Sequence, residues 1–191
     1  MRNLGPLLGF VLLAAVVALF GASWLLPSRV EVERHELIAA PRERLHAWVG
    51  DLRRWPEFAP WSERADPTAV FRFEGPGDEA GAVLAWRGER LGEGRLTVTA
   101  SDPAKGLWYD LSLAGGRRLW KGAVRYLPAG SPGATEVVWS QAGELGGVLA
   151  RWQGLAVDRA LGPALEESLE RLAGLVEGSP AGPDRPKPPG D

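Results

Sequence analysis

Few side chains in this sequence are of the types that carry out catalysis or bind metal ions. The chain has two histidines, His35 and His46, and no cysteine among its 191 residues. Without thiols there is no disulfide, thiolate metal site or cysteine nucleophile, and two separated histidines form no ligand cluster. The motifs of serine hydrolases, zinc proteases and phosphate-binding loops are absent. The sequence therefore predicts no catalytic residue, no metal site and no cofactor.

The hydroxyl groups of the two tyrosines, Tyr109 and Tyr126, are the remaining candidates for acid–base chemistry. They would matter in a cyclase- or dehydratase-like enzyme acting on an apolar substrate, because such an enzyme needs a buried acid, base or hydroxyl. The glycine-rich run at residues 75–81 lies between two predicted strands, which favours a hairpin turn over a phosphate loop.

Both tyrosines belong to short segments in which apolar residues recur at every second position, as is typical of half-buried strands. These segments cover residues 69–74, 82–87, 94–101, 107–113, 119–127 and 135–141, and residues 29–38 form an earlier strand. Short turns between them predict an antiparallel meander. The alternation places on one inward face Leu84, Trp86, Leu96, Val98, Tyr109, Leu111, Val124, Tyr126, Val137 and Trp139. This set can line an apolar cavity or form a solid core.

A long amphipathic helix is predicted at residues 155–176, where apolar residues recur every three or four positions. Gly162-Pro163 lies inside this stripe and predicts a kink or a second helix start. We expect Val157 and Leu161 to contact a ligand, and we include Leu165 in the cavity lining. The C-terminal half of the helix, from Leu165 on, is expected to be mainly core. A helix that covers one face of an antiparallel sheet gives an α+β domain.

A proline-stiffened loop ahead of the meander carries Trp55, Phe58 and Trp61. These aromatic residues can form a portal that touches lipid headgroups, or a plug that closes one end of the core. The plug is the favoured interpretation for Trp61, which we include in the predicted cavity lining.

The two ends of the chain differ in composition from the domain between them. Residues 4–26 are uncharged and apolar, and as a helix they would span about 34 Å, enough to cross a bilayer. We predict a membrane anchor at residues 1–28, a domain at 29–177 and a disordered Pro/Gly-rich tail at 178–191. A cleaved signal peptide is the alternative, although the apolar run continues through Trp24 and lacks a good cleavage site.

The charge distribution gives weaker information about location and partners. The short N-terminal tail favours a domain outside the cytoplasm, whereas the arginines that follow the apolar run do not. The formal net charge is −2 and there is no basic block, so nucleic acid is not an expected partner. Protein partners cannot be read from these patterns.

Local patterns spread over residues 30–176 resemble those of a known fold. They are Val30–Arg34 with Ile38–Pro41, Asp51–Pro56 with Pro60-Trp61, Gly81 with Trp86, Gly92–Val98, Thr135–Trp139, and Gly162-Pro163 with Leu169 and Leu172. In this order they resemble the START/Bet v1-like (SRPBCC) superfamily, and in it the polyketide cyclase/dehydrase and lipid-transport branch, which includes membrane-anchored members. The resemblance implies a helix-grip fold, with a curved antiparallel sheet wrapped on the terminal helix around a hydrophobic cavity. No catalytic motif is shared across this branch.

We therefore expect a membrane-tethered domain that binds a lipid or other hydrophobic small molecule between the sheet and the terminal helix. One alternative is a cyclase- or dehydratase-like enzyme acting on an apolar substrate. The other is a protein-interaction module without a ligand.

Overall fold

The computed structural model describes residues 5–116 and 118–178, except for the side chains of residues 5–8. The predicted order of one strand, short helices, six strands and a long helix is confirmed, and with it the α+β class. The elements are α1 (Gly5–Ser23), β1 (Arg29–Ile38), α2 (Arg42–Val49), the 3-10 helix η1 (Leu52–Arg54), α3 (Trp55–Phe58), β2 (Val70–Glu74), β3 (Val83–Gly88), β4 (Gly92–Asp102), β5 (Gly106–Leu113), β6 (Arg118–Pro128), β7 (Thr135–Glu144), α4 (Val148–Gly154) and α5 (Val157–Gly178).

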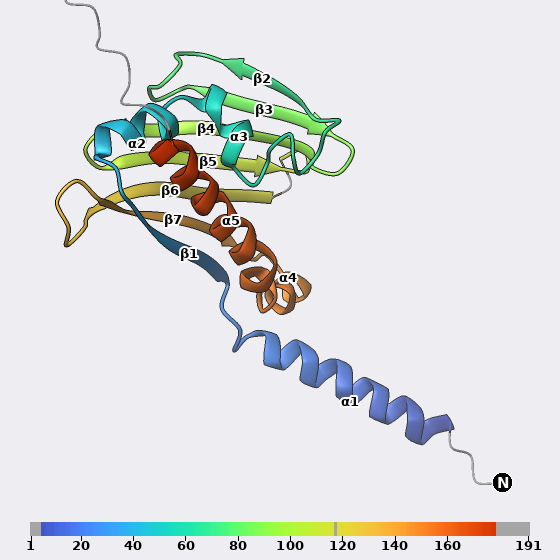
Figure 1. Cartoon of the computed structure of the whole chain (residues 1–191). Helices are drawn as coiled ribbons and strands as arrows, with labels where there is room; N and C mark the ends of the chain where they lie inside the picture. Colours follow the sequence, from blue (N-terminus) through green and yellow to red (C-terminus); the bar gives the residue numbers. More distant parts are fainter. Residues whose placement is uncertain (1–4, 117, 179–191) are drawn as a thin grey trace, which may run out of the picture.

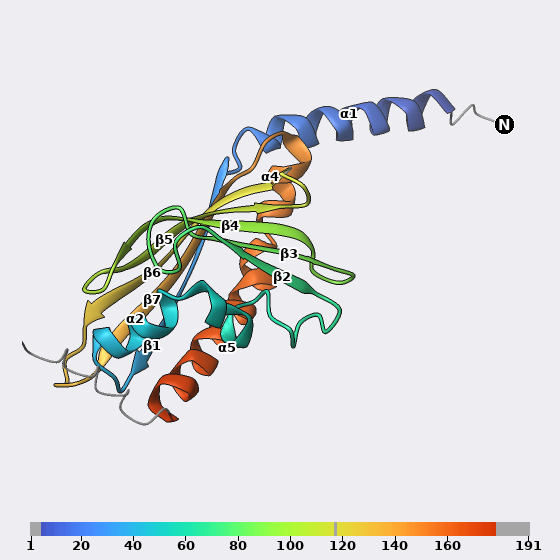
Figure 2. The same ribbon diagram turned by 90° about the horizontal axis from the view of Figure 1, so that it is seen from above.

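All strands form one seven-stranded antiparallel sheet with the order β1-β7-β6-β5-β4-β3-β2. Strands β2 to β7 form the predicted meander, and β1 pairs with β7 from Arg29 opposite Glu144 to Ile38 opposite Thr135. The sheet is strongly curved, and α2, α3 and α5 lie on one of its faces (Figures 1 and 2). We call this the inner face and the opposite one the outer face.

The predicted terminal helix is found as α5, but its interruption is not where the sequence suggested. Leu155 and Ala156 separate α5 from the short helix α4, whereas Pro163 lies inside α5. The prediction of a second helix start at Gly162-Pro163 is therefore wrong. The C-terminal half of α5 buries Leu165, Leu169, Leu172 and Val176 against the sheet, because these residues share one side of the helix.

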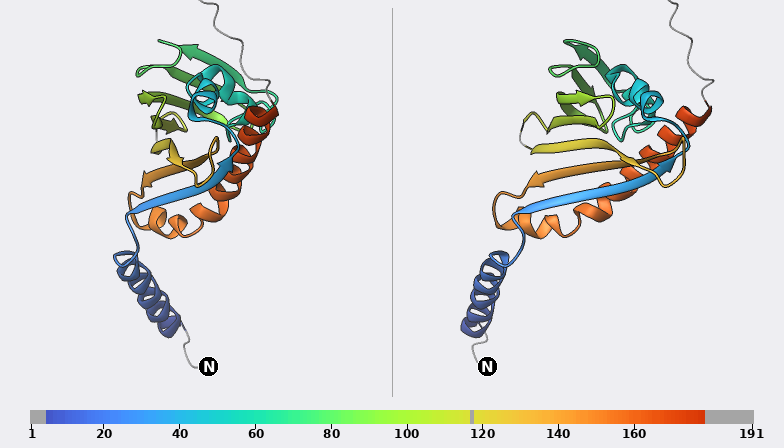
Figure 3. Two further views of the ribbon diagram at one scale, coloured as in Figure 1. Left: turned by 60° about the vertical axis from the view of Figure 1, so that its left-hand side comes forward. Right: turned by 90° about the vertical axis from the view of Figure 1, so that its left-hand side faces the viewer.

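Helix α1 extends away from the domain in every view (Figure 3). Within residues 5–116 and 118–178, no helix is long and apolar enough to cross a membrane. The predicted transmembrane helix is thus not supported. Residues 1–4 and the predicted tail from residue 179 onward lie outside the described residues.

One buried carboxylate fixes the loop that connects α3 to β2. Asp66 accepts hydrogen bonds from the hydroxyl and amide of Thr68 and from the amides of Arg90 (2.7 Å) and Leu91 (3.0 Å). These hydrogen bonds hold the pKa of Asp66 well below its usual range. The bond from the Thr68 hydroxyl has the largest effect, followed by the bond from the Leu91 amide. A Cβ on Gly88 would overlap the carboxylate. The loop is therefore held against the β3–β4 turn.

Candidate functional site

The predicted cavity lining shares one interior on the inner face of the sheet. Every strand residue predicted to point inward is buried there, and Trp61 and Leu165 are buried with them. Val157 and Leu161, at the start of α5, are half-buried and pack against the same cluster. The inward phase of the five strands β3 to β7 was thus predicted correctly. That this interior receives a ligand stays a prediction.

Aromatic rings make up the centre of the interior. The ring of Trp55, a residue of α3, makes edge-to-face contacts with Tyr109 and Trp139 at centroid distances of 5.4 and 5.5 Å. Trp61 stacks on Trp86 with centroids 5.2 Å apart and planes within 6° of parallel. Trp61 also stacks on Trp55 at 6.0 Å. The aromatic loop therefore packs into the core, as the plug interpretation predicts for Trp61.

Glycines on the inner face make room for three of the large rings. Trp86 lies opposite Gly94 in the β3–β4 register, and Tyr109 lies opposite Gly122 in the β5–β6 register. A Cβ on either glycine would overlap the facing ring. The third pair is Trp120 with Gly143, where a Cβ would come within 2.8 Å of the indole. Each ring therefore lies across the backbone of the neighbouring strand, and the glycines set how far it projects towards α5.

The two ends of this interior are sealed to different extents. At the end formed by α2, α3 and the C-terminal half of α5, large apolar residues such as Leu45, Phe58 and Leu172 are fully buried. We call this the sealed end. At the other end, where β1 begins and α4 lies, the apolar residues packed on the core are only half-buried; they are Leu91, Leu113, Trp120, Val157 and Leu161. We call this the open end.

The indole N–H groups of the core also differ in how they are satisfied. Trp55 donates to the carbonyl of Val49 (2.8 Å), and Trp139 donates to the hydroxyl of Tyr109 (2.8 Å). Trp61 and Trp86 are 5% and 4% exposed, and their Nε1 atoms have no hydrogen-bond partner among the described residues. A buried donor without an acceptor costs about 1–3 kcal/mol, so such groups are rare in folded proteins.

Neither tyrosine is placed to act as an acid or a base. The Tyr109 hydroxyl oxygen accepts from Trp139 and from the side-chain amide of Gln141 (3.1 Å), and burial raises the pKa of Tyr109 above its usual value. Burial likewise raises the pKa of Tyr126, whose hydroxyl lies 3.2 Å from Nδ1 of His46. The tyrosines thus act here as hydrogen-bonding members of the core, and the enzyme alternative loses the candidates that the sequence offered.

His46 links the buried Tyr126 to the half-buried Ser101. Nδ1 of His46 lies 3.2 Å from the buried Tyr126 hydroxyl, and Nε2 lies 3.2 Å from Ser101 Oγ, so one ring nitrogen donates and the other accepts. Burial lowers the pKa of His46, which keeps the ring neutral, while Asp78 and Asp102 oppose this shift.

An arginine on β1 fastens the N-terminal half of α5. Arg34 donates to Asp158 (2.9 Å) and Glu166 (2.7 Å), which lie one helical turn on either side of Gly162. A Cβ on Gly162 would overlap the guanidinium, so this glycine lets the arginine lie directly on the helix. Hydrogen bonding to Asp158 is the largest of the effects that raise the pKa of Arg34. We call this set of residues the Arg34 clamp.

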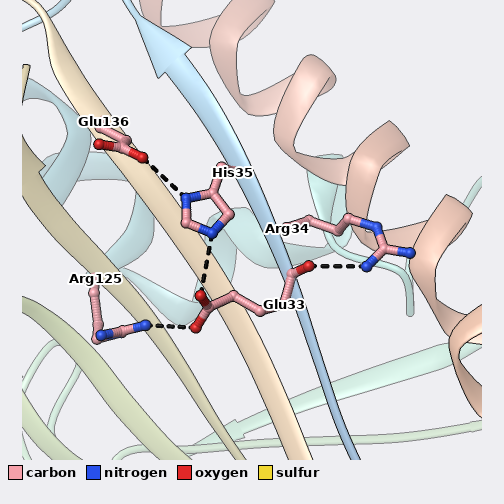
Figure 4. A network of polar contacts seen from close by, with 5 residues as sticks. All are labelled: Glu33, Arg34, His35, Arg125 and Glu136. Carbon is pink, nitrogen blue, oxygen red and sulfur yellow. Dashed lines mark hydrogen bonds and ion pairs between the residues drawn. The ribbon is translucent and has the colours of Figure 1, made fainter.

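His35, the second histidine, belongs to a network on the outer face (Figure 4). Its Nδ1 lies 2.9 Å from Glu136 and its Nε2 lies 3.1 Å from Glu33, and Glu33 also pairs with Arg125 at 2.6 Å. The network connects β1, β7 and β6 and is separated from the interior by the sheet. Among the described residues no group of histidine and carboxylate side chains could hold a metal ion.

Two hollows of ≈ 680 and ≈ 520 Å³ lie on the outer face. Both include Arg95 and Ser112, whose strand positions alternate with the inward residues Leu96 and Leu111. Charged residues line both hollows, and Arg95 is paired with Glu74 at 3.0 Å. They are therefore distinct from the interior that the sequence predicted as a ligand cavity.

Sequence reasoning missed two features of the interior that leave a detectable signal. Gly94, Gly122 and Gly143 occupy inward positions of their strands, where a glycine opposite an aromatic residue indicates a ring lying over the backbone. Asp158 and Glu166 flank Gly162 at four-residue spacing, which indicates one helix face prepared for a cation. The partner, Arg34, could not be found without the packing of β1 against α5.

Solved structures with this fold are similar to the chain throughout the domain. A protein from Chromobacterium violaceum, CV1439, is 18% identical with a TM-score of 0.52, and the match covers 77% of this chain and 96% of that one. Norcoclaurine synthase from Thalictrum flavum is 14% identical with a TM-score of 0.56, covering 78% and 93%. Ara h 8.0201 is 14% identical with a TM-score of 0.52, covering 79% and 99%. At these identities the likeness shows the fold alone.

A comparison with curated proteins finds no match. Residues 29–177, however, match a protein family that is described as "Polyketide cyclase / dehydrase and lipid transport". The matched range has the same boundaries as the domain predicted from the sequence and takes in every element from β1 to α5. The chain therefore belongs to the polyketide cyclase / dehydrase and lipid transport family.

Proposed function

We propose that the domain binds an apolar small molecule or lipid in the interior between the sheet and α5, and that the ligand enters at the open end. The observation that carries this proposal is the incomplete burial of Leu91, Leu113, Trp120, Val157 and Leu161 around an otherwise fully buried aromatic core. Half-buried apolar side chains that face one interior offer contact area that a ligand can cover. The family description and the fold support the same class of ligand.

The covering of the open end is suited to movement. Helix α4 buries none of its residues; Leu149 in its first turn and Leu155 directly after its end are exposed. Segments with few buried contacts open at low free energy, whereas the rest of the domain stays folded. The ligand would enter by displacing α4 and the start of α5, while Leu165 and the residues that follow it keep α5 on the sheet.

The test is binding of the uncharged fluorophore N-phenyl-1-naphthylamine to the full chain. In Leu161→Trp a larger side chain fills the open end, and we expect this variant to bind the fluorophore about tenfold more weakly, which corresponds to about 1.4 kcal/mol. The matched control is Ala160→Trp, because residue 160 is exposed and the added ring points away from the interior.

Helix α1 also presents apolar surface to the fluorophore, so the comparison of the two variants matters more than the total signal. Equal affinity in Leu161→Trp, Ala160→Trp and the unmodified chain would contradict the proposal. So would the absence of saturable binding in the unmodified chain.

We propose further that residues 4–26 hold the domain at a lipid bilayer, on the side away from the cytoplasm. The support is that α1 exposes apolar side chains all round, among them Phe10 (71%), Leu13 (62%) and Val17 (63%). Flotation with phosphatidylcholine vesicles should recover the unmodified chain with the lipid, and the Leu13→Lys, Val17→Lys double variant should remain in the aqueous fraction. In sealed right-side-out membrane vesicles, an added protease reaches only the side away from the cytoplasm. Protection of the domain from this protease would argue against the proposed side.

A further inference from the structure

The starting observation is that two neighbouring donors in the core lack acceptors while two others have them. Trp55 and Trp139 donate to oxygen atoms of the protein at 2.8 Å. Trp61 and Trp86 are also buried, yet neither Nε1 has a partner in the part of the chain that the structure describes. Because the indole N–H is a donor only, an oxygen acceptor must come from elsewhere to satisfy it.

The geometry of the Trp61–Trp86 pair prevents the two rings from satisfying each other. Their planes are within 6° of parallel, and an indole N–H lies in the plane of its own ring. Neither N–H can therefore point at the face of the stacked partner, which is the arrangement that an N–H···π contact needs. Stacking therefore leaves both N–H groups without an acceptor inside an apolar core.

This pair is also held in a fixed place near the open end. Trp86 lies over Gly94 of β4, and the loop that carries Trp61 is fastened to the β3–β4 turn by the hydrogen bonds of Asp66 to Arg90 and Leu91. Leu91, next to these bonds, is one of the half-buried residues that define the open end. A ligand that enters there meets the Trp61–Trp86 pair before it reaches the sealed end.

We infer that the ligand carries a neutral oxygen acceptor, such as a ketone, aldehyde or ester carbonyl, that accepts hydrogen bonds from Nε1 of Trp61 and Trp86. A carbonyl oxygen only accepts hydrogen bonds, through two lone pairs, and so matches groups that only donate. A carboxylate is disfavoured because no cationic side chain is buried in the core of the described residues, and a buried unpaired charge is costly. This inference rests on the proposed function and adds to it the chemical class of the ligand's polar group.

The experiment compares 9-fluorenone with fluorene, which have nearly the same shape but differ in one carbonyl oxygen. The full chain, in detergent micelles, is labelled with ¹⁵N at its tryptophan indoles, and the nine indole signals are assigned with Trp→Phe variants. Fluorenone should bind about tenfold more tightly than fluorene and should move the Hε1 signals of Trp61 and Trp86 downfield. The signals of Trp55 and Trp139 serve as internal controls because their N–H groups are already bonded.

The variant Trp86→Phe keeps an aromatic ring and removes the N–H group. It should lose most of the preference for fluorenone while still binding fluorene, and Trp61→Phe provides the same test if Trp86→Phe fails to fold. Trp108→Phe, on the outer phase of β5, should keep the preference.

The outcomes separate this inference from the proposed function. Equal binding of both compounds, with no movement of the two indole signals, would overturn the acceptor inference and leave ligand binding standing. Indole signals of Trp61 and Trp86 that are already at hydrogen-bonded positions in the ligand-free chain would also overturn it, because water would then be the partner. Binding of neither compound would overturn the proposed function and the inference together.

Discussion

The sealed end and the open end of the core are covered by the same helix, but they use it differently. The C-terminal half of α5 carries four fully buried residues, Leu165, Leu169, Leu172 and Val176. In the N-terminal half, Val157 and Leu161 continue the same apolar stripe and are only half-buried. An identical periodicity thus leads to two levels of burial, because burial depends on what lies opposite the helix.

The structure opposite each half explains this difference. The C-terminal half of α5 lies against α2, α3 and the end of β1, where the amide of Ala39 bonds to Glu177 at 2.9 Å. Opposite the N-terminal half, Gly143 lets the half-buried Trp120 lie across the sheet, and the helix is fastened by polar contacts of Arg34. We conclude that the sealed end supplies stability, while the open end is free to be remodelled.

The largest difference between the two ends is expected from truncating leucines on α5. Leu169→Ala should lower the free energy of unfolding by about 3 kcal/mol, because Leu169 is fully buried and its removal leaves a cavity. Leu161→Ala, at the open end, should cost only about 1 kcal/mol because part of its surface is already in water. Urea denaturation of the full chain followed by tryptophan fluorescence measures both values. Equal losses would show that the open end is packed as tightly as the sealed end.

Replacing an inward glycine with alanine should also lower the free energy of unfolding more beside a fully buried ring than beside a half-buried one. The difference should be smaller than that between the two leucine variants. In Gly122→Ala the new Cβ overlaps the ring of Tyr109, which is fully buried and bonded to Trp139 and Gln141, so we expect a loss of about 2 kcal/mol. In Gly143→Ala the Cβ approaches Trp120 to 2.8 Å, but this half-buried indole can move, so the loss should stay below about 1 kcal/mol.

The same denaturation assay compares these two variants, and near-UV circular dichroism shows whether the aromatic core is disturbed. A larger loss of stability in Gly143→Ala than in Gly122→Ala would contradict this contrast, because it would show that Trp120 is held more rigidly than Tyr109.

The extent to which the sequence predicted these two regions follows from the range of the interactions involved. Alternation along the strands predicted the inward face because a side chain's face depends only on its own position and the pleat. The same local rule predicted the stripe on α5. It could not show that Leu172 meets a full set of neighbours and Leu161 does not, because that difference is set by contacts between distant segments.

The errors of prediction have the same origin. Gly162-Pro163 suggested a kink or a second helix start because proline lacks a backbone donor. The second start is wrong because α5 continues through Pro163, and Gly162 accommodates Arg34 from a strand more than 120 residues earlier in the chain. The tyrosines looked like candidate catalytic groups because of their rarity. Their partners, Gln141 for Tyr109 and His46 for Tyr126, were not visible in any local pattern.

The smallest effect on global stability, and the most specific to the open end, is expected from breaking the Arg34 clamp. Arg34→Met keeps most of the side-chain length and removes the ion pairs to Asp158 and Glu166, which are more than half exposed. Exposed ion pairs contribute little, so the free energy of unfolding should fall by about 1 kcal/mol or less. Amide hydrogen exchange should nevertheless become faster in α4 and in α5 up to about Leu161, with no change from Leu165 onward.

The matched control for Arg34→Met is Arg171→Met, because the ion pair of Arg171 with Glu167 lies within α5. It should leave the exchange of α4 unchanged. If ligand entry requires the open end to move, Arg34→Met should also speed the association of N-phenyl-1-naphthylamine with the chain more than it changes the equilibrium affinity, since the clamp opposes opening and does not line the interior. Faster exchange spread evenly over both halves of α5 would instead mean that the helix moves as one body, and the distinction between a sealed and an open end would then not describe its dynamics.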